Sequence, residues 1–265
     1  MATYLDRILA AHRAAAATDD RDLGALVAAA VGLPPTRGFG QALVESSADG
    51  LAVIAEVKRR SPSKGDLHAD LDPAAVAAAY EAGGAACLSV LTDREHFGGS
   101  PDDLRAARAA VSLPVLRKDF TVSRHDVVDA RLMGADCVLL IVAALDDAEL
   151  RAFHGLAVEV GLDVLVEVHD EPELDRALAV GATLVGVNQR DLVTFEVDTS
   201  RAVRMAPQMP GGVVRVAESG VRGPDDAARL AAAGYHAVLV GESVVTAGDH
   251  AGAVAALRTA AHRSR

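Results

Sequence analysis

The sequence predicts an α/β protein, a (β/α)8 TIM barrel preceded by an N-terminal helical extension. From residue 51 onward, eight short apolar runs start about 20 to 35 residues apart, as expected for the buried parallel strands of repeated β/α units. Amphipathic helical segments separate these runs. Several segments end at a glycine that leads directly into the next run, as in E-A-G-G-A-A-C and L-M-G-A-D-C, and glycine is a common helix stop.

The predicted strands are the apolar runs 51–57, 86–91, 114–118, 137–142, 163–168, 183–188, 213–218 and 237–241. The predicted helices are the segments 73–82, 101–110, 124–133, 146–160, 171–180, 199–205, 224–233 and 249–261. An open, doubly wound parallel sheet would show a similar alternation. Because no G-x-G-x-x-G motif follows the first strand, the closed barrel is favoured over that alternative.

Residues 1–50 precede the regular pattern and form an alanine-rich extension. Tyr4 and Leu5 begin an apolar stripe with helical spacing, and glycine and proline interrupt the pattern further on. We expect this extension to pack on the barrel as a lid rather than to form a loose tail. A length of 265 residues fits one large domain or two small ones, so length alone leaves both open. With the barrel pattern at 51–265 and the extension at 1–50, a single domain over 1–265 is expected.

The composition limits the classes of partner. A net charge of −11 leaves no broad basic surface for nucleic acid, so an anionic substrate would need a local basic pocket. The sequence has no run of roughly 18 uncharged apolar residues, and Asp6 and Arg7 interrupt the N-terminus where a signal peptide would be apolar. We therefore expect a cytoplasmic protein with no membrane partner, and a monomer is the default expectation.

Neither the cysteines nor the histidines are spaced like metal ligands. Cys87 and Cys137 lie in apolar runs fifty residues apart and are expected to be buried small hydrophobes. The nine histidines are scattered along the chain, so we expect no metal site.

The first strand and the loop after it combine charged and turn-forming residues. Glu56 and Lys58 interrupt the apolar run two residues apart, so both side chains leave the same face of the strand. The loop that follows contains S-P-S-K-G, whose residues favour turns and supply free hydroxyl and N–H groups. A carboxylate and an ammonium beside a polar loop indicate a functional site.

Lysine and asparagine are rare in this chain, and they lie at or just after the ends of predicted strands. Only three of the 26 basic residues are lysine, namely Lys58, Lys64 and Lys118, and the only asparagine is Asn188. Arginine cannot release a proton near neutral pH, whereas lysine can when its pKa is lowered. A compositional bias is the alternative explanation for this pattern.

Polar residues follow six of the predicted strands at their carboxyl ends, where (β/α)8 barrels carry their active sites. The glycine-flanked segments E-S-G and V-G-E-S after the last two strands offer backbone N–H groups of the kind that bind phosphate. A phosphorylated small-molecule substrate is therefore expected. These strand-end positions are Glu56, Lys58, Lys118, Glu167, His169, Asn188, Arg190, Glu218, Ser219, Gly220, Gly241, Glu242 and Ser243.

Taken together, the motifs resemble the indole-3-glycerol phosphate synthase family. The matching segments are V-I-A-E-V-K-R-R-S-P-S-K-G, L-S-V-L-T-D with F-G-G-S, P-V-L-R-K-D-F, A-D-C-V-L-L-I-V, L-V-E-V-H-D, G-V-N-Q-R-D-L, V-A-E-S-G and L-V-G-E-S. They cover residues 51–245 in register, and the extension matches more weakly. The resemblance implies that 1-(2-carboxyphenylamino)-1-deoxyribulose 5-phosphate is cyclised, decarboxylated and dehydrated to indole-3-glycerol phosphate, with no cofactor.

The resemblance also implies roles for the catalytic set. Lys118 would be the general acid at the ketone oxygen, Glu167 the base in dehydration, and Lys58 a second acid or electrostatic partner. Which of the two lysines acts as the acid in each step stays open. Glu56 would orient the lysines. Crowding of the lysines would lower their pKa values and the two glutamates would oppose that change, so the net direction depends on geometry.

The substrate-binding positions follow from the same resemblance. Asn188 and Glu218 would hydrogen-bond the sugar hydroxyls, and Arg190 would help to bind an anion. The expected phosphate site consists of Ser219, Gly220, Gly241 and the backbone of Glu242. The remaining positions that contact substrate would be Ser61 in the first loop and Phe97 and Phe120 beside the anthranilate ring.

Two positions depart from the family pattern, Arg60 in the first motif and His96 before the phenylalanine. Neither residue replaces a proposed catalytic group, so they bear on the expected affinity for substrate and not on the expected chemistry. A non-catalytic paralogue that binds a phosphorylated ligand is one alternative. An aldose-ketose isomerase of the same pathway is another, although it would use a cysteine or aspartate base.

Overall fold

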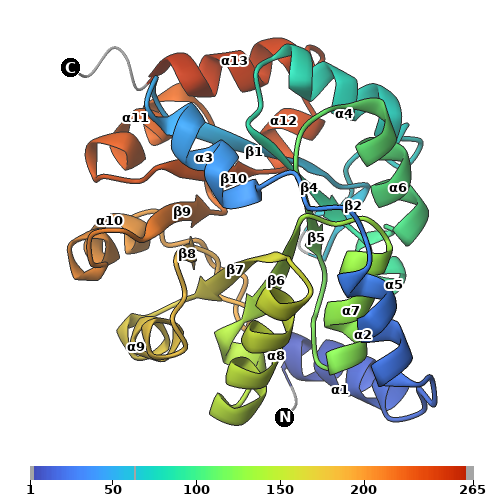
Figure 1. Ribbon diagram of the computed structural model, residues 1–265. Coiled ribbons are helices and arrows are strands. Elements are labelled where there is room, and N and C mark those ends of the chain that lie inside the picture. Colours follow the sequence, from blue (N-terminus) through green and yellow to red (C-terminus); the bar gives the residue numbers. More distant parts are fainter. Residues whose placement is uncertain (1–2, 63, 261–265) are drawn as a thin grey trace.

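The computed structural model describes residues 3–62 and 64–260, so Ser63 of the first loop and Ala261 at the end of the last predicted helix lie outside the described residues. Figure 1 shows a ring of strands surrounded by helices. The strands of the ring are β1 (Ala52–Val57), β4 (Cys87–Leu91), β5 (Val115–Lys118), β6 (Cys137–Ile141), β7 (Asp163–Val168), β8 (Leu184–Asn188), β9 (Val214–Glu218) and β10 (Ala237–Val240).

These eight strands form a closed barrel in the order β1-β10-β9-β8-β7-β6-β5-β4, and every pairing is parallel. The ring closes where β1 pairs with both β4 and β10, so it has no free edge. This confirms the predicted (β/α)8 fold and excludes the open sheet. Each predicted strand agrees with the observed one to within one residue at either end.

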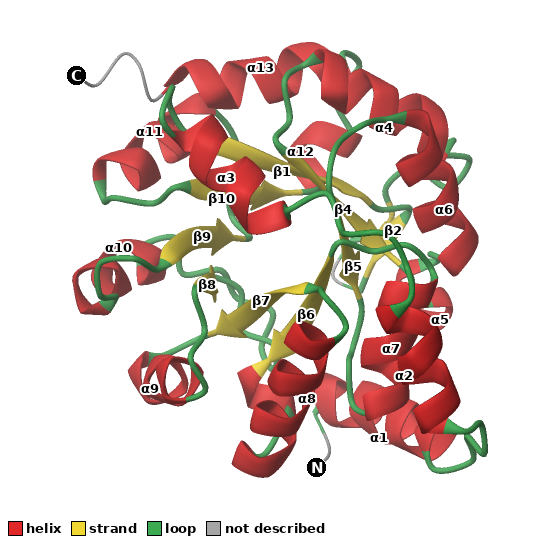
Figure 2. Cartoon of the chain, viewed as in Figure 1, coloured by secondary structure: helices red, strands yellow, loops and turns green. Residues whose placement is uncertain are grey.

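Helices cover the outside of the ring (Figure 2). Most begin at a side chain that accepts a hydrogen bond from the first turn. For example, Asp72 caps one helix with Pro73 at its first position, and Asp146 forms a capping box with Glu149 in another. The outer helices are α4 (Pro73–Ala82), α6 (Pro101–Ala110), α7 (Arg124–Leu132), α8 (Asp147–Glu159), α9 (Glu171–Ala179), α10 (Arg201–Met205), α11 (Pro224–Ala232) and α13 (His250–Ala260).

Several short elements in the loops were not predicted. The first loop contains β2 (Arg60–Ser61) and β3 (Gly65–Asp66), which pair as an antiparallel hairpin. The helices α5 (Arg94–Phe97) and α12 (Glu242–Val245) follow β4 and β10, and two 3-10 turns, η1 (Val142–Ala144) and η2 (Ala206–Gln208), complete the set. Segments of two to four residues are too short for a hydrophobic period to be recognised.

The N-terminal extension forms three helices, α1 (Tyr4–Ala16), α2 (Leu23–Val31) and α3 (Phe39–Ser47). They lie in different places. In α1, His12 Nε2 is 3.0 Å from Asp93 Oδ2, just beyond the carboxyl end of β4. α2 packs on α7, whereas α3 lies at the opposite end of the barrel, where the Gly40 amide donates to Asp163 at the start of β7. Only α1 therefore occupies the position expected of a lid.

The core is built from valine, leucine and alanine, with Tyr80 and Phe39 as the largest fully buried side chains. Cys87 and Cys137 are buried and free, as expected. In the part of the chain that the structure describes, no helix is both long enough and apolar enough to cross a membrane.

Candidate active site

A cavity of about 640 Å³ opens at the carboxyl ends of the barrel strands. All fourteen residues predicted for the site line it, although they come from loops and strands throughout the barrel. They are Glu56, Lys58, Ser61, Phe97, Lys118, Phe120, Glu167, Asn188, Arg190, Glu218, Ser219, Gly220, Gly241 and Glu242. The structure thus brings these fourteen positions together, while the role of each residue stays a prediction. Of the other strand-end residues named from the sequence, Ser243 also lines the cavity and His169 does not.

Glu56 and Lys58 form an ion pair on one face of β1, with Glu56 Oε1 2.6 Å from Lys58 Nζ. Their spacing of two residues places them together, as the alternation of a strand requires. Ser89 of β4 donates to the second Glu56 oxygen at 3.2 Å, which fixes the carboxylate. A side-chain carbon at Gly241 would lie 2.5 Å from Glu56 Oε1 and 2.9 Å from Lys58 Nζ. A side chain at this position, directly after β10, would therefore displace the ends of the Glu56 and Lys58 side chains.

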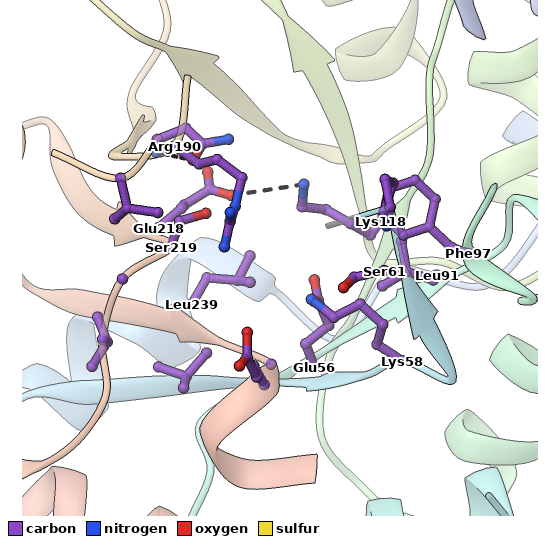
Figure 3. Close-up of a pocket in the computed structure, with 18 of the residues that line it drawn as sticks. Glu56, Lys58, Ser61, Leu91, Phe97, Lys118, Arg190, Glu218, Ser219 and Leu239 are labelled. Carbon is purple, nitrogen blue, oxygen red and sulfur yellow. Dashed lines mark hydrogen bonds and ion pairs between the residues drawn. The ribbon is translucent and has the colours of Figure 1, made fainter. Parts of the chain in front are cut away.

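Lys118, the last residue of β5, faces two acidic residues across the cavity. Its Nζ lies 3.3 Å from Glu167 Oε2 and 3.8 Å from Glu218 Oε2, and the side chains of Lys118 and Glu218 face each other in Figure 3. Burial lowers the pKa of Lys118, but the charges of Glu167, Glu218 and Glu56 outweigh it and raise that pKa above its usual range. The surrounding carboxylates thus favour the charged ammonium form of Lys118.

Glu167 is fully enclosed at the end of β7, with 1% of its side chain exposed. Lys118 donates to its Oε2, and the Asn188 amide donates to its Oε1 at 3.1 Å. Burial raises the pKa of Glu167, but Lys118, His169 and the Asn188 hydrogen bond together lower it below its usual value. An ionised carboxylate in contact with the cavity is a suitable proton acceptor.

Glu218 at the end of β9 has the opposite electrostatic environment. Burial and the negative charge of Glu167 raise the pKa of Glu218 well above its usual value, against the effect of Lys118. Its Oε1 is buried and has no hydrogen-bond partner among the described residues. A protonated carboxyl with a free oxygen can exchange hydrogen bonds with a substrate hydroxyl. Gly186 leaves the space that this side chain fills, since an added carbon there would lie 2.1 Å from Glu218 Oε1.

The predicted phosphate corner lies between the loops after β9 and β10. Ser219 has a left-handed φ of 63° and Gly220 follows with a φ of 74°, so two successive residues turn sharply at the strand end. The Gln189 side chain donates to the Ser219 carbonyl at 2.8 Å and fixes this turn. Such turns orient successive backbone N–H groups towards one point and favour anions.

Apolar residues from β4, β6 and the loops after β4 and β5 form part of the cavity wall. The Phe97 and Phe120 rings lie 6.4 Å apart between centroids, and Leu91, Leu139 and Ile141 line the wall beside them. Arg190 reaches the cavity from the loop after β8, where its guanidinium donates to the Phe195 carbonyl at 3.0 Å. Charged groups and apolar side chains thus both line the cavity.

Sequence reasoning missed the rim of this cavity. His12 from the extension, Asp93 after β4 and Asp119 after β5 place one ligand-type atom each within 4.8 Å of one another. The His12 ring bonds Asp93, and Asp119 accepts from Thr92 and Arg117, so hydrogen bonds within the protein account for the cluster. No local pattern could indicate this contact, because His12 and Asp93 are 81 residues apart.

The two departures from the family pattern also lie at the rim. The Arg60 guanidinium donates to the carbonyl of Glu95, and the His96 ring packs edge-on against Tyr4 at 5.7 Å. Tyr4 also contacts Phe195 at 5.3 Å, so α1 bridges the loops after β4 and β8.

Comparisons with known proteins show the family of the chain. A family model described as "Indole-3-glycerol phosphate synthase" matches residues 5–257. Proteins of that name are similar over most of the chain. The protein from Nocardioides sp. is 61% identical over 207 residues, covering 78% of this chain and 80% of that protein. The protein from Mycobacteroides abscessus is 52% identical over 260 residues, covering 97% and 94%.

Solved structures support the fold alone. Thiamine phosphate pyrophosphorylase from Pyrococcus furiosus superposes with a TM-score of 0.61 at 17% identity, covering 82% of this chain and 98% of that one.

Proposed function

The chain belongs to the indole-3-glycerol phosphate synthase family, and we propose that the cavity at the strand ends is its active site. The enzyme is a carboxy-lyase of tryptophan biosynthesis. It converts 1-(2-carboxyphenylamino)-1-deoxyribulose 5-phosphate to indole-3-glycerol phosphate, carbon dioxide and water. The observation that carries the proposed site is the position of Lys118 Nζ, which faces Glu167 and Glu218 inside a cavity bounded by an apolar wall and an anion-binding turn.

Ring closure needs a proton at the ketone oxygen of the substrate. As the aromatic carbon that carries the carboxylate attacks the ketone carbon, the oxygen gains negative charge and takes a proton from Lys118. The charged state of Lys118 supports this role, because a general acid must hold its proton before the step. The iminium that ring closure creates then accepts the electron pair released as carbon dioxide leaves.

Dehydration needs a base and a second acid. Glu167 removes the ring proton, while Lys58 protonates the departing hydroxyl or stabilises it electrostatically. The lowered pKa of Glu167 keeps it ionised, and Glu56 holds Lys58 on the strand face that borders the cavity. After product release, Glu167 gives up the proton it removed and the lysines regain theirs, so that one proton is taken from solvent in each cycle.

The shape of the cavity orients the substrate. We place the phosphate at Ser219, Gly220, Gly241 and the Glu242 backbone, and the sugar hydroxyls beside Asn188 and Glu218. Arg190 helps to bind an anion. The aromatic ring then reaches Phe97 and Phe120, and Ser61 covers the substrate from the first loop.

The remaining features belong to the same proposal. The enzyme acts in the cytoplasm as a monomer, without a cofactor, a metal or nucleic acid. The chain forms one domain, with the barrel at 51–265 and the extension at 1–50. The net charge of −11 and the local basic groups of the cavity support a small anionic substrate.

A fluorescence time course with the synthetic carboxyphenylamino-ribulose phosphate tests the function directly. The native protein should produce indole fluorescence with multiple turnovers. If the folded protein only binds the compound, as calorimetry would show, the catalytic reading is wrong and the non-catalytic paralogue holds. The isomerase alternative has less support, since its cysteine or aspartate base would replace the set of Lys58, Lys118 and Glu167, and all three of these residues line the cavity.

A further inference from the structure

The ring of His169 lies beside the proposed base. His169 follows β7, two residues after Glu167, so the strand directs both side chains to the same side. His169 Nε2 lies 3.6 Å from Glu167 Oε1. The Nε2 atom is buried and has no hydrogen-bond partner in the described part of the chain. A buried polar atom without a partner is uncommon in a folded protein, and the group nearest to this one is the Glu167 carboxylate.

Glu173, in the first turn of α9, holds the other side of this ring. Its Oε2 lies 3.0 Å from His169 Nδ1 and also accepts the His169 backbone N–H at 2.7 Å. Asp170 in turn caps the helix by accepting from the Glu173 amide at 2.9 Å. Because an ionised carboxylate only accepts hydrogen bonds, Nδ1 carries a hydrogen and Nε2 is left to face Glu167.

Three charged groups act on the His169 ring. Glu173 and Glu167 favour the imidazolium, whereas Arg201 of α10 disfavours it. Burial lowers the pKa of His169, but the two glutamates outweigh it and raise that pKa above its usual value. The ring is therefore charged on the acidic side of neutrality, where the ionisation of Glu167 decides whether a base is present.

We propose that His169 and Glu173 are positioning residues, which orient the Glu167 carboxylate and favour its ionised form before it removes the ring proton. The proposal rests on the proposed function, in which Glu167 is the base. Neither His169 nor Glu173 lines the cavity, so both act through Glu167 and leave substrate contacts unchanged. Asn188 and Lys118 donate hydrogen bonds to Glu167, and His169 Nε2 is a further neighbour of Glu167 Oε1.

Substitutions at His169 should separate its two effects, which are to orient the Glu167 carboxylate and to favour the ionised form of that carboxylate. His169→Gln can keep a neutral donor near Glu167, whereas His169→Leu removes both ring nitrogens. We expect kcat to fall by about tenfold in His169→Leu and less in His169→Gln, a fraction of the roughly 10²- to 10⁴-fold that a general base contributes. KM should change less than kcat. In both variants the acid limb of the pH profile of kcat/KM should shift to higher pH by about one unit, because the loss of a nearby cation raises the pKa of Glu167.

Glu173→Gln tests the same chain of contacts with a smaller change in shape. It should move the acid limb in the same direction by weakening the imidazolium, and it should add no further shift in a His169→Gln background. Glu171→Gln removes a charge from the same helical turn without touching His169, so it should leave the pH profile as in the native enzyme. If the acid limb of the His169 and Glu173 variants matches that of the native enzyme, the positioning role is wrong.

Glu167→Gln separates this proposal from the proposed function. If Glu167→Gln keeps native activity, the base assignment fails and the positioning role fails with it. If Glu167→Gln is inactive while the His169 and Glu173 variants keep the native kcat and pH profile, only the positioning role is overturned. Thermal unfolding of every variant shows that the comparison is made between folded proteins.

Discussion

At the scale of single residues, two carboxyl groups near Lys118 have pKa values that are shifted in opposite directions. Glu167 accepts hydrogen bonds from Lys118 and Asn188, and its pKa is lowered, whereas burial beside Glu167 raises the pKa of Glu218. Two carboxylates that share one cation and little water do not both ionise readily. We therefore assign proton abstraction to Glu167 and neutral hydrogen bonding to Glu218.

This assignment predicts different effects of two matched substitutions. Glutamine resembles a protonated glutamic acid, so Glu218→Gln should lower kcat/KM by no more than about tenfold. Glu167→Gln removes the base and should lower kcat by roughly 10² to 10⁴. Steady-state kinetics of both variants measures the difference. An equal loss in the two variants would mean that Glu218 works in its ionised form.

Some residue-scale features were readable from the sequence and others were not. The spacing of Glu56 and Lys58 predicted that they would share one face of a strand, and they form an ion pair there. The net direction of the Lys118 pKa depended on Glu167 and Glu218, which lie 49 and 100 positions further along the chain. Such distances require the three-dimensional fold.

At the scale of elements, the loop after β10 depends on the first strand. Gly241 lies where an added carbon would meet Glu56 Oε1 and Lys58 Nζ. Both atoms belong to the proposed site, so the loop cannot accept a larger residue without moving the ion pair. The sequence placed both motifs at strand ends, but it gave no sign that they touch.

Gly241→Ala is therefore expected to lower kcat/KM by more than tenfold, because displacement of Lys58 and the phosphate turn disturbs binding and chemistry together. Gly155→Ala is the matched control, since α8 leaves open space around that position. It should keep native activity and stabilise the helix by up to about 1 kcal/mol. Native activity in Gly241→Ala would show that the close approach has no functional consequence.

α1 contacts the cavity rim through a titratable pair. The hydrogen bond to Asp93 raises the pKa of His12 above its usual value, although burial opposes this. A raised folded-state pKa means that the contribution to stability is complete below the usual histidine pKa of about 6.5 and is lost as the pH rises through the folded value.

The stability of the native protein should therefore fall more steeply than that of His12→Gln between about pH 6 and pH 8. Thermal unfolding in a series of buffers measures this difference. Parallel curves for the two proteins would show that the His12 and Asp93 contact does not depend on charge.

At the scale of the whole molecule, the extension serves both ends of the barrel. α1 bridges the loops after β4 and β8 through Tyr4, while α3 packs at the amino ends of the strands, where Phe39 and Leu43 are fully buried. The sequence predicted an extension that packs on the barrel, but not this division. The segment between α1 and α2 ends at Asp22, which caps α2, and this cap was not recognised as a helix start.

The barrel itself was predictable because its signals repeat. Eight apolar runs with glycine stops between them agree with one another, and the observed ring follows their order. The short hairpin of β2 and β3 and the helix α12 carry no such repetition, although both border the cavity. The parts of a barrel that differ between functions are thus the parts that periodicity cannot predict.

The central claim is that Lys118 delivers the proton that starts ring closure. The direct measurement is kcat of Lys118→Met together with the dissociation constant for the substrate, obtained from single-turnover fluorescence and from calorimetry. The account predicts that kcat falls by at least about 10²-fold, while the folded variant still binds substrate. A Lys118→Met enzyme that turns over at close to the native rate would contradict the account and leave Lys58 as the acid for that step.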